Sequence, residues 1–154
     1  MEGVGVFRAS ESFGTVKGYV LFTQDEGSVV INVEISGLIP RTFHGFHIHK
    51  SGDLRRGCDS CCSHYNPDDN THGGLEDENS HAGDLGNLYA DENGTCKITL
   101  TTEKFFVEEI IGRSIIIHES MDDLGRGGHK DSKTTGNSGK RIACAVIGFS
   151  EKSC

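Results

Sequence analysis

The sequence predicts an all-β domain, built as a sandwich or barrel of about eight short strands. Three observations support this fold class. The clearest hydrophobic periodicity repeats every two residues, no segment carries a sustained helical stripe, and turn signals separate several of the apolar runs. Glycine occurs 21 times and proline twice, a balance that favours many turns over extended linkers.

The strongest alternation lies in Ser28–Ser36, where every second residue from Val29 to Ile35 is valine or isoleucine. This pattern predicts a strand with one buried and one wet face. Turn residues at 25–27 and 92–94 mark ends of such runs. Shorter apolar runs predict further strands at Val4–Arg8, Val16–Thr23, Phe43–His49, Cys96–Thr101, Arg113–His118 and Ile142–Phe149.

Two long, polar, glycine-rich segments, 50–81 and 120–140, interrupt this rhythm and show no clear strand. Loops longer than about 12–15 residues are usually functional or disordered. Surface disorder is the simpler explanation, but we expect order, because the first segment holds three histidines and more lie nearby. No repeat or domain boundary is visible, so residues 1–154 are expected to form a single domain.

The charge balance argues against several classes of partner. Fifteen lysines and arginines stand against 23 acidic residues, which gives a net charge of −8. Nucleic-acid-binding proteins need a basic face, and a membrane-spanning helix needs about 20 apolar residues. The first six residues also lack the pattern of a signal peptide. We therefore expect a soluble, cytoplasmic protein that binds neither nucleic acid nor membrane.

Histidine is concentrated between residues 44 and 81, where six of the eight lie. On a strand, His47 and His49 would point to the same face, as a shared metal ion requires. Two surface histidines that flank a buried Ile48 are the simpler alternative. His118 ends an apolar run and would by itself be read as a core residue. Together with His47, His49 and His64 it makes four nitrogens, a donor set that favours Cu(II).

A second set of metal ligands lies along the first long loop and its exit. It offers three imidazole nitrogens and one carboxylate, a donor set that suits tetrahedral Zn²⁺ in a closed structural site. Metal binding would also keep a long glycine-rich loop ordered, since its free energy contributes to folding. The members of this set are His64, His72, His81 and Asp84.

These residues stand in motifs that follow one another along almost the whole chain. The motifs are Gly45–His49, Gly52–Asp53, His64–Pro67, His72–Gly74, His81–Asn87, His118–Glu119, Asp122–Gly125 and Gly136–Cys144. In this order and spacing they resemble the copper/zinc superoxide dismutase family. The resemblance implies an eight-stranded antiparallel Greek-key β-barrel or sandwich, immunoglobulin-like in type, with two long functional loops.

The resemblance also implies how the site residues are used. Copper would be bound by His47, His49, His64 and His118, and zinc by His64, His72, His81 and Asp84. His64 would then bridge both metals as an imidazolate. Asp122 would hydrogen-bond to ligands of both metals and so orient their rings.

The implied reaction is the disproportionation of superoxide to dioxygen and hydrogen peroxide, an antioxidant activity. Copper would cycle between oxidation states, zinc would be structural, and His64 would also transfer a proton. Arg141 would lie beside copper and hold the anionic substrate. Residues 120–141 carry five cations and three carboxylates, and we expect this local positive charge to attract superoxide.

The cysteines follow the family only in part. The resemblance implies a Cys58–Cys144 disulfide, although disulfides are rare in the cytosol. Cys61 and Cys62 depart from the family pattern and leave open a rival pairing with Cys144, a redox role, a fragment of a zinc site, or simply free thiols. Cys96 and Cys154 are expected to be unpaired.

The resemblance further implies a homodimer. Its contact surface would include Val4, Val6, Gly52, Ile111, Gly112 and the strand near Ile147 and Phe149. Ser51 replaces a bulky apolar residue at this surface, and Lys50 and Arg55 add charge, so we expect a weaker dimer.

Three classes of function stay open at this point. The first is the dismutase, the second is a metal-binding module or copper carrier without turnover, and the third is a zinc-stabilised structural protein with a vestigial copper site. The complete copper ligand set, with Arg141 and Asp122, favours the enzyme. Whether a copper chaperone is a partner is left open by the sequence.

Overall fold

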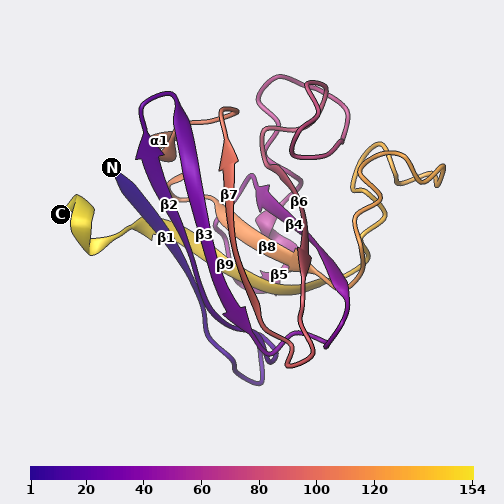
Figure 1. Ribbon diagram of the computed structural model, residues 1–154, viewed down its shortest axis with the longest axis horizontal. Coiled ribbons are helices and arrows are strands. Elements are labelled where there is room, and N and C mark those ends of the chain that lie inside the picture. The colour runs from indigo at the N-terminus through magenta and orange to yellow at the C-terminus, as the bar shows by residue number, and fades with distance from the viewer.

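The computed structural model describes residues 1–154 and shows eight antiparallel strands that form a nearly closed barrel (Figure 1). Around the sheet the strands follow the order β6-β4-β8-β9-β1-β2-β3-β7. Pairing of β4 with β8 and of β3 with β7 requires crossover connections between strands distant in sequence, as in a Greek key. The all-β prediction is confirmed. The strands are β1 (Glu2–Phe7), β2 (Lys17–Asp25), β3 (Ser28–Ser36), β4 (Phe43–His49), β6 (Asp84–Tyr89), β7 (Cys96–Thr102), β8 (Ser114–His118) and β9 (Arg141–Phe149).

A few short elements lie outside this sheet. They are strand β5 (Arg55–Cys58), the single-turn helix α1 (Val107–Ile110), and the 3₁₀ turns η1 (Asp59–Cys61) and η2 (Glu151–Ser153). The structure holds no helix with the length and apolar character that crossing a membrane demands.

The alternation in the sequence predicts β3, and a shorter apolar run predicts β4, both with their observed bounds; the five other predicted runs also contain strands. Strands β5 and β6 were not predicted. Strand β5 has only four residues and no apolar alternation. In β6 polar and apolar residues are buried side by side, and Asn87 hydrogen-bonds to the backbone of Asp122 in the second long loop. Because both faces of β6 are covered, its sequence lacks the period of two that marks a half-exposed strand.

The barrel interior positions the histidines of β4. Phe46 and Ile48 are fully buried and belong to the main core of 25 residues. Successive side chains on a strand face opposite sides, so His47 and His49 lie on the outer face of β4. They are buried there as well, since the long loops cover this face. The apolar residues of β4 therefore fix the direction in which its histidines point.

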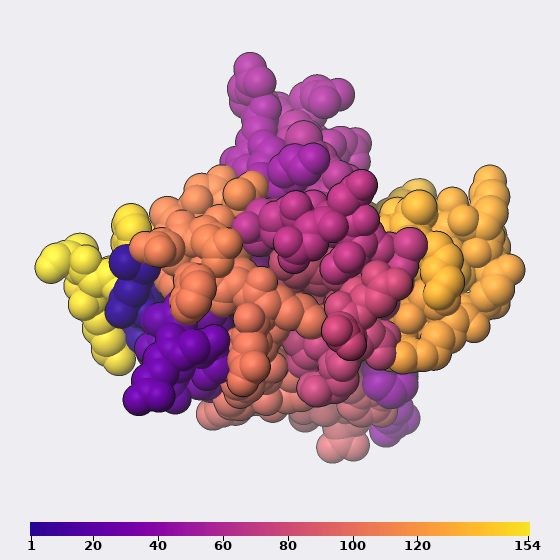
Figure 2. All heavy atoms as spheres, turned by 90° about the horizontal axis from the view of Figure 1, so that it is seen from above, coloured from indigo at the N-terminus to yellow at the C-terminus, as the bar shows by residue number.

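The two long loops lie beside one another on one side of the barrel (Figures 1 and 2). Residues 50–81 and 120–140 are joined by a hydrogen bond from His72 N to Lys133 O of 2.9 Å. An ion pair of 2.6 Å between Arg126 and Asp77 joins them again. The expectation that these segments are ordered agrees with these contacts.

A disulfide joins Cys58, at the end of β5, to Cys144 in β9, as the family resemblance implies. It ties the first long loop to a core strand. The other four cysteines are free, with Cys61 and Cys96 buried and Cys62 and Cys154 exposed. Cys61 packs in a small cluster with Cys144 and Ile116, so the free-thiol interpretation holds and the rival pairings do not occur in this structure.

Removal of the disulfide in a Cys58→Ser/Cys144→Ser variant is expected to lower the free energy of unfolding by about 4 kcal/mol, because the bond closes a long loop in the unfolded chain. The cysteines are 86 residues apart. Urea denaturation of the metal-free protein would measure the change. Cys154→Ser, at an exposed free thiol, is the control, and equal stabilities of the two variants would contradict the prediction.

Candidate metal centre

Four buried histidines meet on the outer face of the barrel, and each has a ring nitrogen without a hydrogen-bond partner. One ligand atom from each lies within 4.8 Å of those of the others. A buried polar atom without a hydrogen-bond partner destabilises a fold, so we expect these nitrogens to bind a ligand. A metal ion accepts all four lone pairs at once, so the residues fit copper. The unpartnered atoms are His47 Nδ1, His49 Nε2, His64 Nε2 and His118 Nε2.

Strand pairing brings these four residues together from distant parts of the sequence. Strand β4 pairs with β8 between Phe46–Ile117 and His49–Ser114, and a register shift after Ile117 precedes His118. An isolated bridge between His49 and His64 draws the first long loop onto the end of β4. The predicted copper ligands are therefore neighbours in the folded chain.

The second nitrogen of three of these rings donates a hydrogen bond to an oxygen. The partners are Asp122 Oδ2 for His47 Nε2 at 2.6 Å, the Cys62 carbonyl for His49 Nδ1 at 2.8 Å, and the Gly139 carbonyl for His118 Nδ1 at 3.1 Å. A proton held on the outer nitrogen leaves the lone pair on the inner one. These bonds select the tautomer that binds a metal.

The other predicted ligand set converges on one carboxylate oxygen. Asp84 Oδ1 lies 3.0 Å from His64 Nδ1, 3.0 Å from His72 Nδ1 and 3.2 Å from His81 Nδ1. Asp84 Oδ2 accepts hydrogen bonds from the backbone N–H groups of Gly73 and His81, which fix the carboxylate. His72 Nδ1 is near Asp84 but makes no hydrogen bond. Three nitrogens and one oxygen at this spacing fit the donor set of tetrahedral zinc.

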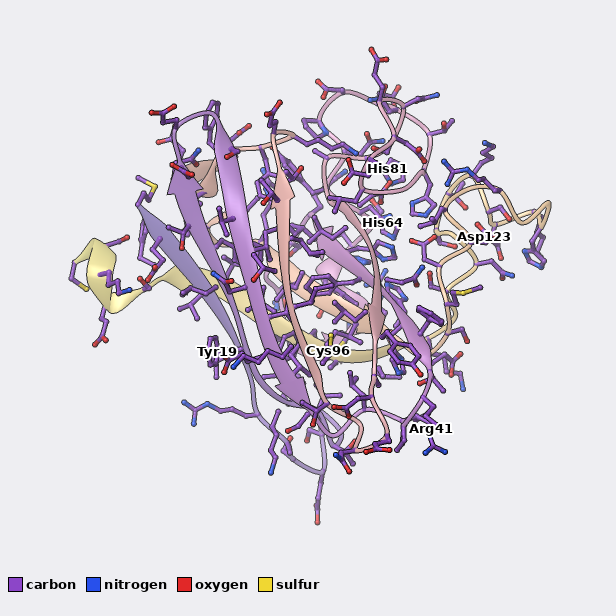
Figure 3. The ribbon with its side chains drawn as sticks, viewed as in Figure 1. Tyr19, Arg41, His64, His81, Cys96 and Asp123 are labelled. Carbon is purple, nitrogen blue, oxygen red and sulfur yellow. A yellow bond between two sulfur atoms is a disulfide. The ribbon has the colours of Figure 1, made fainter.

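A second grouping by distance contains His47 in place of His81, together with His64, His72 and Asp84. We favour His81 as the fourth member. The only unpartnered nitrogen of His47 is Nδ1, which the first cluster uses, whereas His81 Nδ1 lies 3.0 Å from His64 Nδ1. Figure 3 shows His64 and His81 close together at the base of the first long loop.

His64 and Asp122 connect the two clusters. His64 presents Nε2 to the first cluster and Nδ1 to the second. Asp122, which is buried, accepts hydrogen bonds from His47 Nε2 at 2.6 Å and from His72 Nε2 at 2.7 Å. The structure therefore brings together every residue that the sequence predicts as a metal ligand, with Asp122 bonded to one member of each cluster.

Burial and the two carboxylates set the protonation of these rings. Burial lowers the pKa values of His47, His49 and His64, and it lowers that of His118 to about 4. These imidazoles are therefore neutral at pH 7, the state that binds metals. Burial also acts on His72, but its contacts with Asp122 and Asp84 outweigh it and raise the pKa of His72 to about 9.

Both carboxyl groups are ionised despite their burial. Burial by itself would raise the pKa of Asp84 and that of Asp122. Their contacts with the histidines outweigh this effect and hold both pKa values well below the usual range for aspartate. Asp84 is therefore available as an anionic ligand and Asp122 as an acceptor.

A cleft of about 760 Å³ opens over the first cluster. His49, His64 and His118 line it, together with Arg141. The Arg141 guanidinium donates hydrogen bonds to the Cys58 carbonyl at 2.8 Å and to the Cys62 carbonyl at 2.6 Å. Two of its N–H groups are thus used for orientation, and the others remain for a bound anion.

Two further residues support this site without having been predicted to do so. The Cys62 carbonyl accepts bonds from both His49 and Arg141, and Cys62 adopts a φ of +64° in a backbone region that favours glycine. Buried His44 bonds through Nδ1 to the carbonyl of His118 at 2.8 Å. A single histidine or cysteine carries no sequence signal for such a role. Neither metal-binding group contains a cysteine, so the interpretation of Cys58, Cys61 and Cys62 as part of a zinc site is wrong.

This fold and site are those expected of a class of proteins that bind two metal ions on an antiparallel β-barrel, through two adjacent ligand clusters with one shared histidine. A family model described as copper/zinc superoxide dismutase matches residues 16–147. The chain belongs to the copper/zinc superoxide dismutase family.

Individual relatives agree with this assignment. The chain is 48% identical over 142 residues to a Cu-Zn superoxide dismutase of Paramecium bursaria Chlorella virus 1, with 90% of this chain and 76% of that protein covered. It is 47% identical over 138 residues to the copper chaperone for superoxide dismutase of Rattus norvegicus, with 89% of this chain but only 50% of the chaperone covered. The crystal structure of the clock protein EA4 superposes with a TM-score of 0.90 at 41% identity, over 97% of this chain and 94% of that one.

The Asp122→Asn substitution is expected to weaken metal binding about 10- to 100-fold, because an amide cannot accept hydrogen bonds from both rings through two equivalent oxygens. Competition with a chelator would measure copper and zinc affinities separately. Asp68→Asn, at an exposed carboxylate of the first long loop, provides the control. An unchanged affinity for both metals in the Asp122 variant would refute this role.

Proposed function

We propose that this protein is a superoxide dismutase that acts as a single domain in antioxidant defence and converts superoxide to dioxygen and hydrogen peroxide. The observation that carries the proposal is the set of four unpartnered histidine nitrogens beneath a cleft that also presents Arg141. Copper would be held by His47, His49, His64 and His118, and zinc by His64, His72, His81 and Asp84. Bound copper would supply one-electron redox chemistry, whereas zinc has none.

Arg141 would bind and orient the substrate. Superoxide is a small anion, and a guanidinium offers fixed donors to anions. Arg141 donates hydrogen bonds to the carbonyls of Cys58 and Cys62, which fix the orientation of its guanidinium group. Its free N–H groups therefore have a fixed orientation as well. The fixed orientation of Arg141 thus favours an anion bound in the cleft that it shares with the first cluster.

His64 would supply a proton to the product. It lines the cleft, and its Nε2 atom makes no hydrogen bond to the protein. Its Nδ1 atom faces Asp84 at 3.0 Å, which fixes the ring. When Nε2 is protonated, it is positioned to donate that proton into the cleft, where peroxide would form.

A copper carrier without turnover is the second candidate, favoured by the 47% identity to the rat copper chaperone. That relative is twice as long as the matched region, and the match covers half of it. The arrangement of Arg141 over the cleft supports catalysis more directly, since a carrier has no need of a fixed anion donor. Superoxide consumption by the metal-loaded protein, with a metal-free control, separates the two candidates.

We also propose that two copies pair through the exposed faces of β1 and β9. Val6, Val146 and Phe149 are 48%, 39% and 55% exposed there. They adjoin a groove with seven apolar lining residues. Ile147, which the sequence places near this surface, is fully buried in the core, so its neighbours on β9 supply the contact.

The Arg141→Ile substitution is expected to lower the rate of superoxide consumption about tenfold or more while copper and zinc remain bound, because Arg141 is not a ligand. Stopped-flow kinetics and metal analysis on the same sample would test both statements. Arg56→Ile, at an exposed arginine outside the cleft, is the matched control. An unchanged rate in the Arg141 variant would remove this residue from the mechanism.

For the dimer, sedimentation at micromolar concentration is expected to show two copies of the wild-type chain and one copy of a Val146→Glu variant, since a charge would be buried in the contact. Ile39→Glu places the same charge on an apolar side chain that is 59% exposed elsewhere. It is expected to leave the dimer intact. A monomeric wild-type protein would overturn the proposed pairing.

A further inference from the structure

Lys50 lines the cleft that the first ligand cluster shares with Arg141, although the sequence places it on the expected dimer surface. It follows His49 at the end of β4. Its side chain is exposed, and its ammonium group forms none of the ion pairs found in the molecule. Lys50 therefore adds a positive charge without an ion-pair partner to the lining of the cleft.

The backbone of Lys50 is held from both sides. Its N–H donates to the Ser63 carbonyl at 2.8 Å, and its carbonyl accepts a hydrogen bond from Arg113 Nη1 at 2.9 Å. Ser63 and Lys50 are each one residue from the paired His64 and His49. Since consecutive Cα atoms are about 3.8 Å apart, the base of the Lys50 side chain is fixed next to the ligand cluster.

The sign of the net side-chain charge that lines the cleft depends on this residue. The ionic side chains that line it are three cations, Lys50, Lys133 and Arg141, and two carboxylates, Asp69 and Asp131. The balance is one positive charge in a chain with a net charge of −8. Without Lys50 these side chains would carry no net charge, and with glutamate in its place their net charge would be negative, before the charge of any bound metal ion is added.

The cations of the second long loop cannot replace Lys50. Of the five predicted to attract the substrate, only Lys133 and Arg141 line the cleft. Arg126 instead pairs with Asp77. Lys133 and Arg141 together only balance Asp69 and Asp131. Residues 120–141 therefore contribute fewer cations to the lining of the cleft than their sequence indicates.

We propose that Lys50 strengthens the preference of this cleft for small anions and raises the rate at which superoxide enters it. The inference rests on the proposed dismutase function. Lys50 does not contact the reacting atoms, so it acts on capture and leaves the chemical step to other groups. A charged cleft raises the association rate of a small ion of opposite sign, and dissolved salt screens this effect.

The test compares Lys50→Glu, Lys50→Gln and Lys50→Arg with a Lys17→Glu control. Lys17 is exposed on β2 outside the cleft, so Lys17→Glu changes the net charge by the same amount as Lys50→Glu. Each protein is loaded with copper and zinc, and its metal content and thermal unfolding are measured first. Two readouts follow, kcat/KM for superoxide at ionic strengths of about 0.01 M and about 0.15 M, and azide affinity from the visible absorption of bound copper.

We expect Lys50→Glu to lower kcat/KM about threefold or more at low ionic strength and to weaken azide binding in parallel. Lys50→Arg should match the wild type in kcat/KM and azide affinity. Lys50→Gln should give values between those of the wild type and those of Lys50→Glu. Added salt should lower kcat/KM of the wild type but not that of Lys50→Glu. Lys17→Glu should change both readouts much less than Lys50→Glu does. If Lys50→Glu does not fold, Lys50→Gln carries the same comparison.

Equal effects of Lys50→Glu and Lys17→Glu would overturn the proposal, because net charge alone would then explain them. Wild-type turnover with no effect of Lys50 on either readout would also overturn it and leave the dismutase function standing. A loaded wild-type protein without turnover, but with azide affinity that depends on Lys50, would contradict the dismutase function and support the anion site.

Discussion

The burial of unpartnered imidazole nitrogens is the constraint on which the rest of this structure depends. Five such nitrogens, on His47, His49, His64, His72 and His118, are buried. A fold that hides them is stable only if something else accepts their lone pairs. Two metal ions would satisfy this requirement, so the loops that cover the histidines and the ions that the histidines would bind would stabilise each other.

The strands of the barrel hold the predicted ligands in position, and the two long loops cover them. Strand β4 directs Phe46 and Ile48 inward and its histidines outward, which makes one side of the sheet a platform for ligands. Asp122 then reaches back from the second long loop to rings of both clusters. Through the Cys62 carbonyl, the first long loop orients a ligand and Arg141 together. Disturbance of either loop would therefore reach both the metals and the anion donor.

Local charge, and not the charge of the whole molecule, decides how an acidic protein of this kind can attract an anion. The net charge of −8 repels superoxide at long range. Among the side chains that line the cleft the balance is positive by a single charge, and it would be zero without Lys50, the residue that follows a ligand. The same motif that places a histidine toward copper thus also places a cation at the mouth of the site.

The sequence by itself determined the strands with one wet face, such as Ser28–Ser36, and the identity of the predicted ligands, because alternation and residue chemistry are local properties of the chain. It could not reveal β6, whose leucines pack in the barrel core while Asn87 hydrogen-bonds to the second long loop. Nor could it place Lys50 in the cleft or His44 behind His118. Those positions depend on which distant strands and loops meet, and only the pairing of β4 with β8 and of His49 with His64 decides that.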